Sequence, residues 1–203
     1  MKTVIWKAVL FLLIPSVCLA QDYSVQAKLT VPLGSEDQIY TVSRVIDGDT
    51  FRLSNGQNLK LAAINVPEIH DTTKLHQEAQ KFGKDVWVYR DIGGDAMKSI
   101  QRFLTGAKNK VRVEPEVEPF DADGNLIAYV YVLVDQLEGG ILPDNEVFFT
   151  EGDRYEIFLN AYLIKMGYAE VILNWPGEEH QELFFKLEKE ARENQKGIWK
   201  KDH

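Results

Sequence analysis

The sequence has almost no cysteine: Cys18 is the only one among 203 residues, and it lies in the N-terminal apolar segment. If that segment is removed, no disulfide can form and the hydrophobic core alone must hold the fold. The sequence also has no internal repeat and no long low-complexity tract. These absences exclude a disulfide-stapled scaffold and a repeat array.

Positive charge is also scarce, because the 23 Lys and Arg residues are outnumbered by 31 Asp and Glu residues and the net charge is −8. Loss of Lys2 and Lys7 with the N-terminal segment would take the net charge to −10. Such a surface disfavours the long-range attraction of a polyanion. Composition therefore argues against tight nucleic-acid binding, although it leaves room for a local basic groove.

The hydrophobic run at 8–14 follows Lys2 and Lys7, and small residues end the segment at Ala20. This pattern predicts a secretory signal peptide at 1–20, whose removal leaves no membrane span in the mature chain. Lipid attachment at Cys18 is the less favoured alternative, because bulky Val17 stands where a small residue is preferred. We therefore expect an exported protein, periplasmic or extracellular.

The rest of the chain predicts a polar tether at 21–38 and one domain at 39–203, with insertions near 69–93 and 135–155. β-branched and alternating residues, with a hairpin turn at Asn55-Gly56, predict strands at 39–46, 50–53, 58–64, 110–117 and 126–134.

Helical patterns occupy the segments between and after these strands. They occur at 71–89 with an interruption at Gly83, from a cap at Asp95 to Gly106, at 156–167 and at 178–194. This order predicts an α+β, mainly β, fold: a five-stranded OB-fold Greek-key barrel with about three helices.

The stretch Asp47-Gly48-Asp49-Thr50 lies between the first two predicted strands. A glycine between two aspartates permits a tight bend that places a carboxylate at the barrel surface, where oxygen ligands suit a hard cation such as calcium. The same residues are common in ordinary turns, where the first aspartate accepts backbone N–H bonds. The motif alone leaves both interpretations open.

A second motif, Asn65-Val66-Pro67-Glu68, ends the third predicted strand. Because proline cannot continue a sheet ladder, we expect Glu68 in a loop beside the start of the second strand. A carboxylate there could accept a proton from water, or position the water for attack on phosphorus. Lys60 on the same strand would offset phosphate charge. Together the two motifs predict a metal-dependent phosphodiesterase.

These motifs, followed in order by DGNLIAYVYV, FLNAYLIKMGYAEV and KGIW, resemble the thermonuclease (staphylococcal-nuclease-like) family from about residue 39 to residue 199. In that family two aspartates and a main-chain carbonyl hold calcium, a glutamate acts as base or positions water, and two arginines clamp the phosphate. The resemblance implies that Asp49 and the carbonyl of Val66 are metal ligands, and that Glu68 is catalytic.

Three positions depart from the family pattern. Asn65 stands where the second metal aspartate is expected, and Lys60 and Asn125 stand where the two arginines are expected. An amide oxygen brings no charge and would hold calcium more weakly. Lys60 lacks the bidentate fork of arginine, and Asn125 is neutral. The resemblance thus implies a weakened calcium site and impaired catalysis, with catalytic and substrate-binding roles at Lys60 and Asn125.

Two hypotheses remain open at this point. One is an exported calcium-dependent nuclease of low activity, and the other is an inactive OB-fold module that binds nucleic acid or a protein partner. In the first, Arg52 or Arg154 could replace a missing arginine. In either case we expect a monomer.

Other features have simpler interpretations. Phe148-Phe149, in the long connection, could cover the barrel mouth or contact a partner. We expect the acidic stretch 114–123 to be a solvated rim, and His180 to be solvated or locally bonded. The remaining aromatic residues are expected in the core: Tyr129, Tyr131, Phe158, Tyr162, Phe184 and Trp199.

Overall fold

A computed structural model of the chain describes residues 39–137 and 143–201. The predicted signal peptide at 1–20, the tether at 21–38 and Cys18 lie outside the described residues, as do residues 138–142 of the long connection. In the part that is described, no helix has both the length and the apolar character needed to cross a bilayer.

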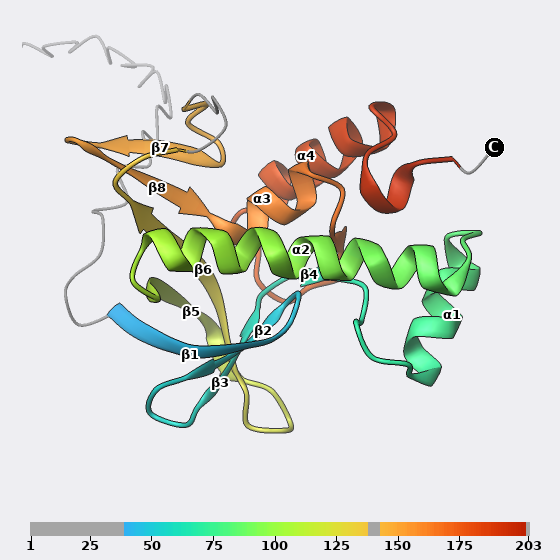
Figure 1. The fold of residues 1–203 in the computed structure, drawn as a ribbon, viewed down its shortest axis with the longest axis horizontal. Helices are drawn as coiled ribbons and strands as arrows, with labels where there is room; N and C mark the ends of the chain where they lie inside the picture. Colours follow the sequence, from blue (N-terminus) through green and yellow to red (C-terminus); the bar gives the residue numbers. More distant parts are fainter. Residues whose placement is uncertain (1–38, 138–142, 202–203) are drawn as a thin grey trace, which may run out of the picture. The chain divides into compact units, whose positions relative to one another are not determined.

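Five strands form a closed barrel (Figure 1). Antiparallel pairing gives the order β3-β2-β1-β5-β6, and a parallel pairing of β3 with β6, which aligns Leu59 with Leu126, closes the sheet. This topology confirms the predicted α+β, mainly β, OB-type fold. The barrel strands are β1 (Ile39–Asp47), β2 (Thr50–Leu53), β3 (Asn58–Leu61), β5 (Lys110–Phe120) and β6 (Leu126–Val134).

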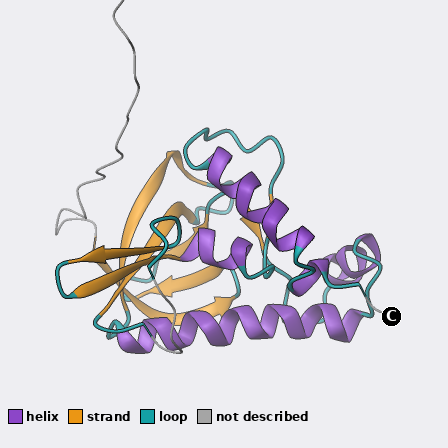
Figure 2. Ribbon diagram, turned by 90° about the horizontal axis from the view of Figure 1, so that it is seen from above, coloured by secondary structure: helices purple, strands orange, loops and turns teal. Residues whose placement is uncertain are grey.

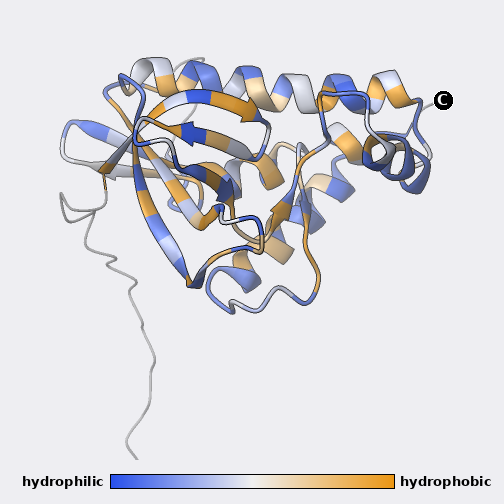
Figure 3. Ribbon diagram, turned by 90° about the horizontal axis from the view of Figure 1, so that it is seen from below, coloured by the Kyte–Doolittle hydropathy of each residue, from blue (hydrophilic) through white to orange (hydrophobic). Residues whose placement is uncertain are grey.

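Alternating side chains explain why the short strands take this position. In β2 and β3 every second residue is buried, so Phe51, Leu53, Leu59 and Leu61 fill the barrel. Their neighbours, Lys60 among them, stay on the outer face. Figure 3 shows this alternation of hydrophilic and hydrophobic residues along the barrel strands. The outward face of β3 is therefore available to polar chemistry.

The predicted C-terminal boundary of the third strand, at residue 64, is wrong. The chain leaves β3 after Leu61 and turns at Ala63, whose φ is +62°. It then forms β4 (Ile64–Asn65), which pairs with β9 (Glu170–Val171) in a separate two-stranded sheet. Asn65 therefore belongs to an element beside the barrel, and not to a barrel strand.

The long connection also contains more structure than its sequence predicted. β7 (Phe148–Glu151) and β8 (Arg154–Phe158) form a hairpin, and β8 extends the sheet next to β6. The helix predicted at 156–167 begins only after this strand, as α3 (Leu159–Lys165). Phe148 is buried, with its ring 6.0 Å from that of Tyr162. It is therefore a core residue, and does not offer a surface to a partner.

Three longer helices complete the domain: α1 (Thr73–Lys81), α2 (Val86–Gly106) and α4 (Gln181–Glu193), followed by a 3₁₀ turn at Gly197–Trp199. The prediction that α2 begins at a cap on Asp95 is wrong. Its cap is Asp85, whose Oδ1 accepts bonds from the backbone of Trp87 and Val88. Figure 2 shows α2 running along one side of the barrel, and it contacts β1 and β6.

The aromatic core predicted from the sequence is largely confirmed. Tyr131 stacks on Phe158 with ring centroids 4.5 Å apart. Trp199 is the exception, since it is only partly buried and lies beside Phe82 under the end of α1. The fully or nearly fully buried members are Tyr129, Tyr131, Phe158, Tyr162 and Phe184.

Candidate active site

The turn between β1 and β2 carries Asp47 and Asp49. Asp49 is only 6% exposed, and its Oδ1 accepts a hydrogen bond of 2.7 Å from Thr50 Oγ1. Its main-chain oxygen accepts a bond of 2.9 Å from Leu61 N, which ties the turn to the end of β3. Asp47 Oδ1 accepts a bond from the Gly48 N–H, as in an ordinary turn.

Gly48 is needed for close packing, because a Cβ at this position would lie 2.4 Å from Val66 Cγ1. The aspartate turn is therefore pressed directly against the segment that follows β4. Any larger residue would push apart the two chain segments that carry the predicted metal ligands Asp49 and Val66.

The segment from Val66 to Glu68 is fixed from the other side by α2. A Cβ on Gly93 would lie 2.1 Å from the main-chain oxygen of Pro67, whereas a Cβ on Gly94 would meet no atom within 4 Å. The helix backbone thus approaches Pro67 as closely as a glycine allows. Because Glu68 follows Pro67 directly, this contact sets where the Glu68 carboxylate emerges.

Asp47, Asp49 and Glu68 act on one another electrostatically. Burial raises the pKa of the Asp47 carboxyl, the charges of Asp49 and Glu68 raise it further, and hydrogen bonds from the backbone of Gly48 and Ile69 oppose the shift. The charges of the two acids singled out in the sequence, Asp49 and Glu68, therefore both reach Asp47. The structure adds Asp47 as a third carboxylate.

Helix α1 contributes two charged residues that sequence reasoning missed. Lys74 Nζ lies 2.9 Å from Glu68 Oε1 and 3.9 Å from Glu78 Oε1. Asn65 Nδ2 donates a hydrogen bond of 2.8 Å to Glu78 Oε1. The available signals were the helix cap at Thr72, which accepts a bond from Leu75 N, and the i,i+4 spacing of Lys74 and Glu78.

Burial and charge shift both of these groups. Burial alone would lower the pKa of Lys74, but the hydrogen bond to Glu68 and the charges of Glu78, Glu68 and Asp49 hold it above its ordinary value. Burial raises the pKa of Glu78, against the effects of Asn65 and Lys74. Lys74 therefore stays positively charged at neutral pH, between three carboxylates.

Glu78 Oε2 is buried and makes no hydrogen bond of ordinary geometry within the described residues. The hydroxyl of Tyr89 is close enough to respond to its charge, since burial and then Glu78 raise the pKa of Tyr89. A buried carboxylate oxygen without a donor is costly unless positive charge lies nearby. Lys74 supplies part of that charge.

Lys60 and Asn125 meet on the outer face where β3 pairs with β6. Asn58 Nδ2 donates to Asn125 Oδ1 at 3.1 Å, and Asn125 Nδ2 donates to Asp121 Oδ2 at 2.8 Å. The amide of Asn125 thus connects Asp121, in the turn before β6, with Asn58 on β3. The positive charge of Lys60 helps to lower the pKa of Asp121. The lysine and the asparagine therefore both act on Asp121.

Neither of the two alternative arginines lies free at this surface. Arg52 is on the outer face of β2 and donates from Nη1 to the main-chain oxygen of Gly56 at 2.8 Å. Arg154 begins β8 and lies 3.5 Å from Asp135. Of the two, only Arg52 is on a strand next to Lys60.

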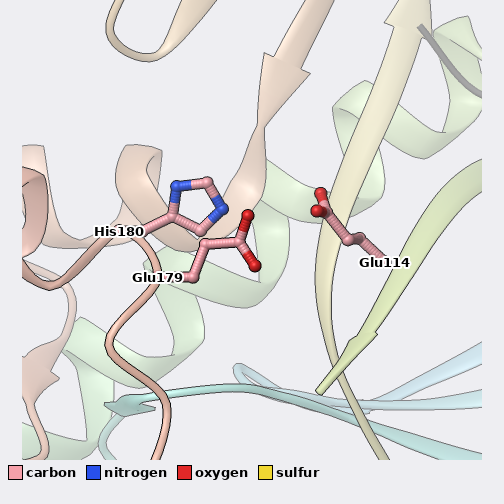
Figure 4. Close-up of side chains that lie close together, drawn as sticks. All are labelled: Glu114, Glu179 and His180. Atoms are coloured by element: carbon pink, nitrogen blue, oxygen red, sulfur yellow. The ribbon is translucent and has the colours of Figure 1, made fainter. Parts of the chain in front are cut away.

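A separate group of polar residues lies between β5 and the start of α4. Ligand-type atoms of Glu114, Glu179 and His180 lie within 4.8 Å of one another, with Glu114 facing the other two (Figure 4). Burial, followed by the charges of Glu114 and Glu116, raises the pKa of Glu179, and burial lowers the pKa of His180.

Protein groups surround this second group, although Glu114 Oε2 is buried without a hydrogen bond among the described residues. Arg112 Nη1 lies 3.8 Å from Glu114 Oε2, and the Tyr131 hydroxyl lies 3.4 Å from His180 Nε2. His180 also packs edge-on against the Tyr129 ring at 4.7 Å. The expectation of a solvated acidic rim is therefore wrong for Glu114, and His180 is half-buried among aromatic rings. Sequence spacing gave no sign of this contact, because its members are far apart in the chain.

The atoms that the predicted metal-ligating residues could offer to a cation are all oxygens. The candidate ligands are the Asp49 carboxylate, the Asn65 amide oxygen and the main-chain carbonyl of Val66; the Asn65 amide nitrogen is bonded to Glu78. Carboxylate, amide and carbonyl oxygens suit a hard cation such as Ca²⁺ better than a zinc or copper ion. The residues present therefore fit calcium chemically, with less negative charge than two aspartates would give.

A closed five-stranded barrel with acids at the β1–β2 turn and beyond β4 defines an OB-fold domain with an acidic site at its surface. Residues 58–201 match the sequence profile of the family described as "Staphylococcal nuclease homologue". The chain belongs to this family.

Individual relatives agree with this assignment. The chain is 30% identical over 165 residues to the Thermonuclease of Staphylococcus intermedius, covering 80% of this chain and 76% of the relative. It is 29% identical over 168 residues to the Thermonuclease of Staphylococcus hyicus, covering 81% and 78%. An uncharacterised protein of Methanocaldococcus jannaschii is 24% identical over 164 residues, covering 78% and 70%.

Proposed function

We propose that this chain is an exported, calcium-dependent hydrolase of phosphodiester bonds in nucleic acid, and that it works more slowly than a site with a second aspartate and two arginines. The observation that supports the proposal is that Asp49 and Glu68 are both close enough to Asp47 and to Lys74 for their charges to act on those two groups, and that Lys74 Nζ lies 2.9 Å from Glu68 Oε1. Two named relatives are thermonucleases, and the chain spans about three quarters of each.

In this proposal each residue has a distinct role. Asp49, Asn65 and Val66 would hold the calcium ion, which when bound supplies positive charge to the phosphate oxygens. Glu68 accepts a proton from the attacking water or positions it. Lys60 contacts the phosphate as a point charge, and Asn125 offers it a neutral donor.

The expected slowness has a physical reason at each altered position. Asn65 brings no negative charge to the cation, and Lys60 cannot contact two phosphate oxygens at once. The amide of Asn125 is already hydrogen-bonded to Asp121 and Asn58. Loss of a comparable arginine contact in phosphoryl transfer lowers the rate by about a thousandfold or more. In addition, the negative net charge of −8 weakens the long-range attraction of nucleic acid to the protein.

The test is hydrolysis of single-stranded DNA, duplex DNA and RNA across a calcium titration, with EGTA as the zero point. Glu68→Gln is the test variant, and Glu118→Gln, at an exposed position on β5, is the matched control. We expect calcium-dependent cleavage that is lost in Glu68→Gln and kept in Glu118→Gln. Cleavage that survives Glu68→Gln would contradict the proposal.

The second candidate is an OB-fold module that binds without cleaving. It is supported by the pairing of Lys74 with Glu68, which neutralises the proposed base, and by the engagement of Asn125 in its own turn. This candidate predicts no cleavage at any calcium concentration, together with measurable binding of a labelled oligonucleotide by fluorescence anisotropy. Cleavage abolished by Glu68→Gln would exclude it.

A further inference from the structure

We propose that Glu78 is a positioning residue for Asn65: it orients the amide so that its oxygen faces the cation, and it supplies from α1 the negative charge that Asn65 lacks. The proposal rests on the cation site of the proposed function. It concerns a residue on a helix that the sequence motifs do not reach.

The orientation follows from hydrogen-bond chemistry. An ionised carboxylate can only accept, so the amide arm that lies 2.8 Å from Glu78 Oε1 must be the nitrogen. The oxygen is then on the other arm of the same planar group, turned away from α1. Without Glu78, the amide of Asn65 could rotate by half a turn and present its N–H groups to a cation, which repels them.

The charge argument uses the second oxygen of Glu78. Oε2 is buried without a hydrogen bond of ordinary geometry among the described residues, and the Glu78 side chain is 16% exposed. Lys74, at 3.9 Å from Oε1, also pairs with Glu68, so it compensates Glu78 only in part. The Tyr89 hydroxyl also hydrogen-bonds the Glu78 carboxylate but brings no positive charge, so a cation held by Asn65 would add to the charge that balances this carboxylate. Partners one layer behind a ligand commonly orient it and strengthen binding.

The same contact means that positions 65 and 78 are matched to each other. An aspartate at 65 would place a carboxylate where the amide nitrogen now lies 2.8 Å from Glu78 Oε1. Two carboxylates at that distance repel one another. A second metal aspartate is therefore compatible with this site only when residue 78 is neutral, and Asn65→Asp alone should repair the site poorly.

The experiment is calorimetric titration of the full chain with Ca²⁺, with no nucleic acid present. The variants are Glu78→Gln, Asn65→Asp and the double variant. Glu170→Gln is the matched control, because the charge of Glu170, like that of Glu68, raises the pKa of Glu78, and because Glu170 is bound by Lys81 at 2.6 Å.

We expect Glu78→Gln to raise the Kd for Ca²⁺ by about tenfold to a hundredfold, and Glu170→Gln to raise it by much less. The double variant should bind Ca²⁺ more tightly than Asn65→Asp alone. Glu78→Gln would then weaken Ca²⁺ binding when residue 65 is asparagine and strengthen it when residue 65 is aspartate. This reversal is a readout that a merely structural role of Glu78 would not produce.

Three outcomes would overturn the proposal. A Kd unchanged by Glu78→Gln, with only a lower melting temperature in EGTA, would make Glu78 a structural residue. Equal tightening by Asn65→Asp with and without Glu78 would show that the positions are not matched. Absence of Ca²⁺ binding in all variants, the double variant included, would remove the cation site itself and the proposed function with it.

Discussion

Lys74 Nζ lies 2.9 Å from Glu68 Oε1, so the carboxylate proposed as the base already has a positively charged partner from the chain. The charge of Asp49 also acts on this lysine. The positive charge of Lys74 would therefore repel a cation bound at this site. The domain thus has an internal competitor for the calcium ion that we propose.

Removing this competitor should tighten calcium binding. In Lys74→Met the repulsion between the ammonium and the divalent cation is lost, which at about 4 Å in a solvated setting amounts to about 2 kcal/mol, or about thirtyfold in Kd. Calorimetric titration measures the change. The control is Lys98→Met, whose lysine pairs with Asp95 on the exposed side of α2. Weaker binding in Lys74→Met would contradict this account of Lys74.

The two neighbouring glycines of α2 should respond to alanine in opposite ways. Gly93→Ala forces a Cβ against the Pro67 oxygen, so we expect a loss of about 1–3 kcal/mol in unfolding free energy and displacement of Glu68. Gly94→Ala meets no atom and improves helix propensity, so we expect a gain of about 0.5–1 kcal/mol. Urea unfolding of both variants tests this. Equal effects would mean that Pro67 does not abut α2.

Asp47→Asn should stabilise the protein at neutral pH and not in acid. Because the pKa of Asp47 is raised in the folded state, the ionised form costs stability as pH rises from the ordinary value of 3.8 through the folded value. The gain from Asn should therefore be absent below about pH 3.8 and complete at neutral pH. Each unit of pKa difference corresponds to about 1.4 kcal/mol. Urea midpoints over this pH range measure it.

Asp121→Asn provides a control of opposite sign. Slight burial would raise the pKa of Asp121, but hydrogen bonds from the side chain and backbone of Asn125 and from the backbone of Asp123 hold it below its ordinary value. Its ionised form therefore adds stability that is lost as pH falls through the folded pKa. Asp121→Asn should destabilise the domain at neutral pH and lose its effect in acid. The same direction in both variants would contradict the assignment of these shifts.

Glu156→Gln should destabilise the barrel strongly. Arg112 and Glu156 form a two-point ion pair with N···O distances of 2.8 and 3.1 Å, and both side chains are 7% exposed. Removing one charge leaves the buried Arg112 with only the more distant carboxylate of Glu114 at 3.8 Å, and loss of one member of a buried pair costs about 3–5 kcal/mol. The control, Glu193→Gln, removes an exposed partner of Lys189 at 3.9 Å and should change stability by less than about 0.5 kcal/mol. Thermal unfolding distinguishes them.

Lys60→Arg should raise kcat/KM for nucleic acid by about tenfold, equivalent to about 1.4 kcal/mol, because a guanidinium can contact two phosphate oxygens at once. Arg52→Lys is the companion change on the neighbouring strand, and we expect no effect on kcat/KM. A drop in Arg52→Lys with no gain in Lys60→Arg would place the phosphate contact on Arg52.

Local patterns in the sequence were sufficient for most barrel strands. Thr50–Leu53 and Leu126–Val134 end where alternation and turn residues predict, because each strand buries one face or both. The break at Ala63 could not be predicted, since a left-handed alanine carries no sequence signal. The cap of α2 was misplaced because Asp85 and Asp95 are equally good caps, and only packing of the preceding turns on the domain distinguishes them.

In the candidate site, too, local motifs predict some residues, whereas others depend on tertiary contacts. Asp49 and Glu68 stand out by their motifs, and their approach to each other follows from the barrel topology. Glu78 and Lys74 were missed because their contacts with Asn65 and Glu68 depend on how α1 folds back over β4. Such a contact is tertiary, and no local spacing encodes it.

The parallel seam between β3 and β6 has a consequence for biosynthesis. It joins Asn58 to Asn125 across 67 positions of the chain, and Lys60 reaches the proposed phosphate surface only when that seam has formed. Non-local pairings of this kind form late in folding. In a nascent polypeptide, Lys60 and Asn125 should therefore come together only after β6 has left the ribosome, so that the proposed phosphate surface is assembled in the later part of synthesis.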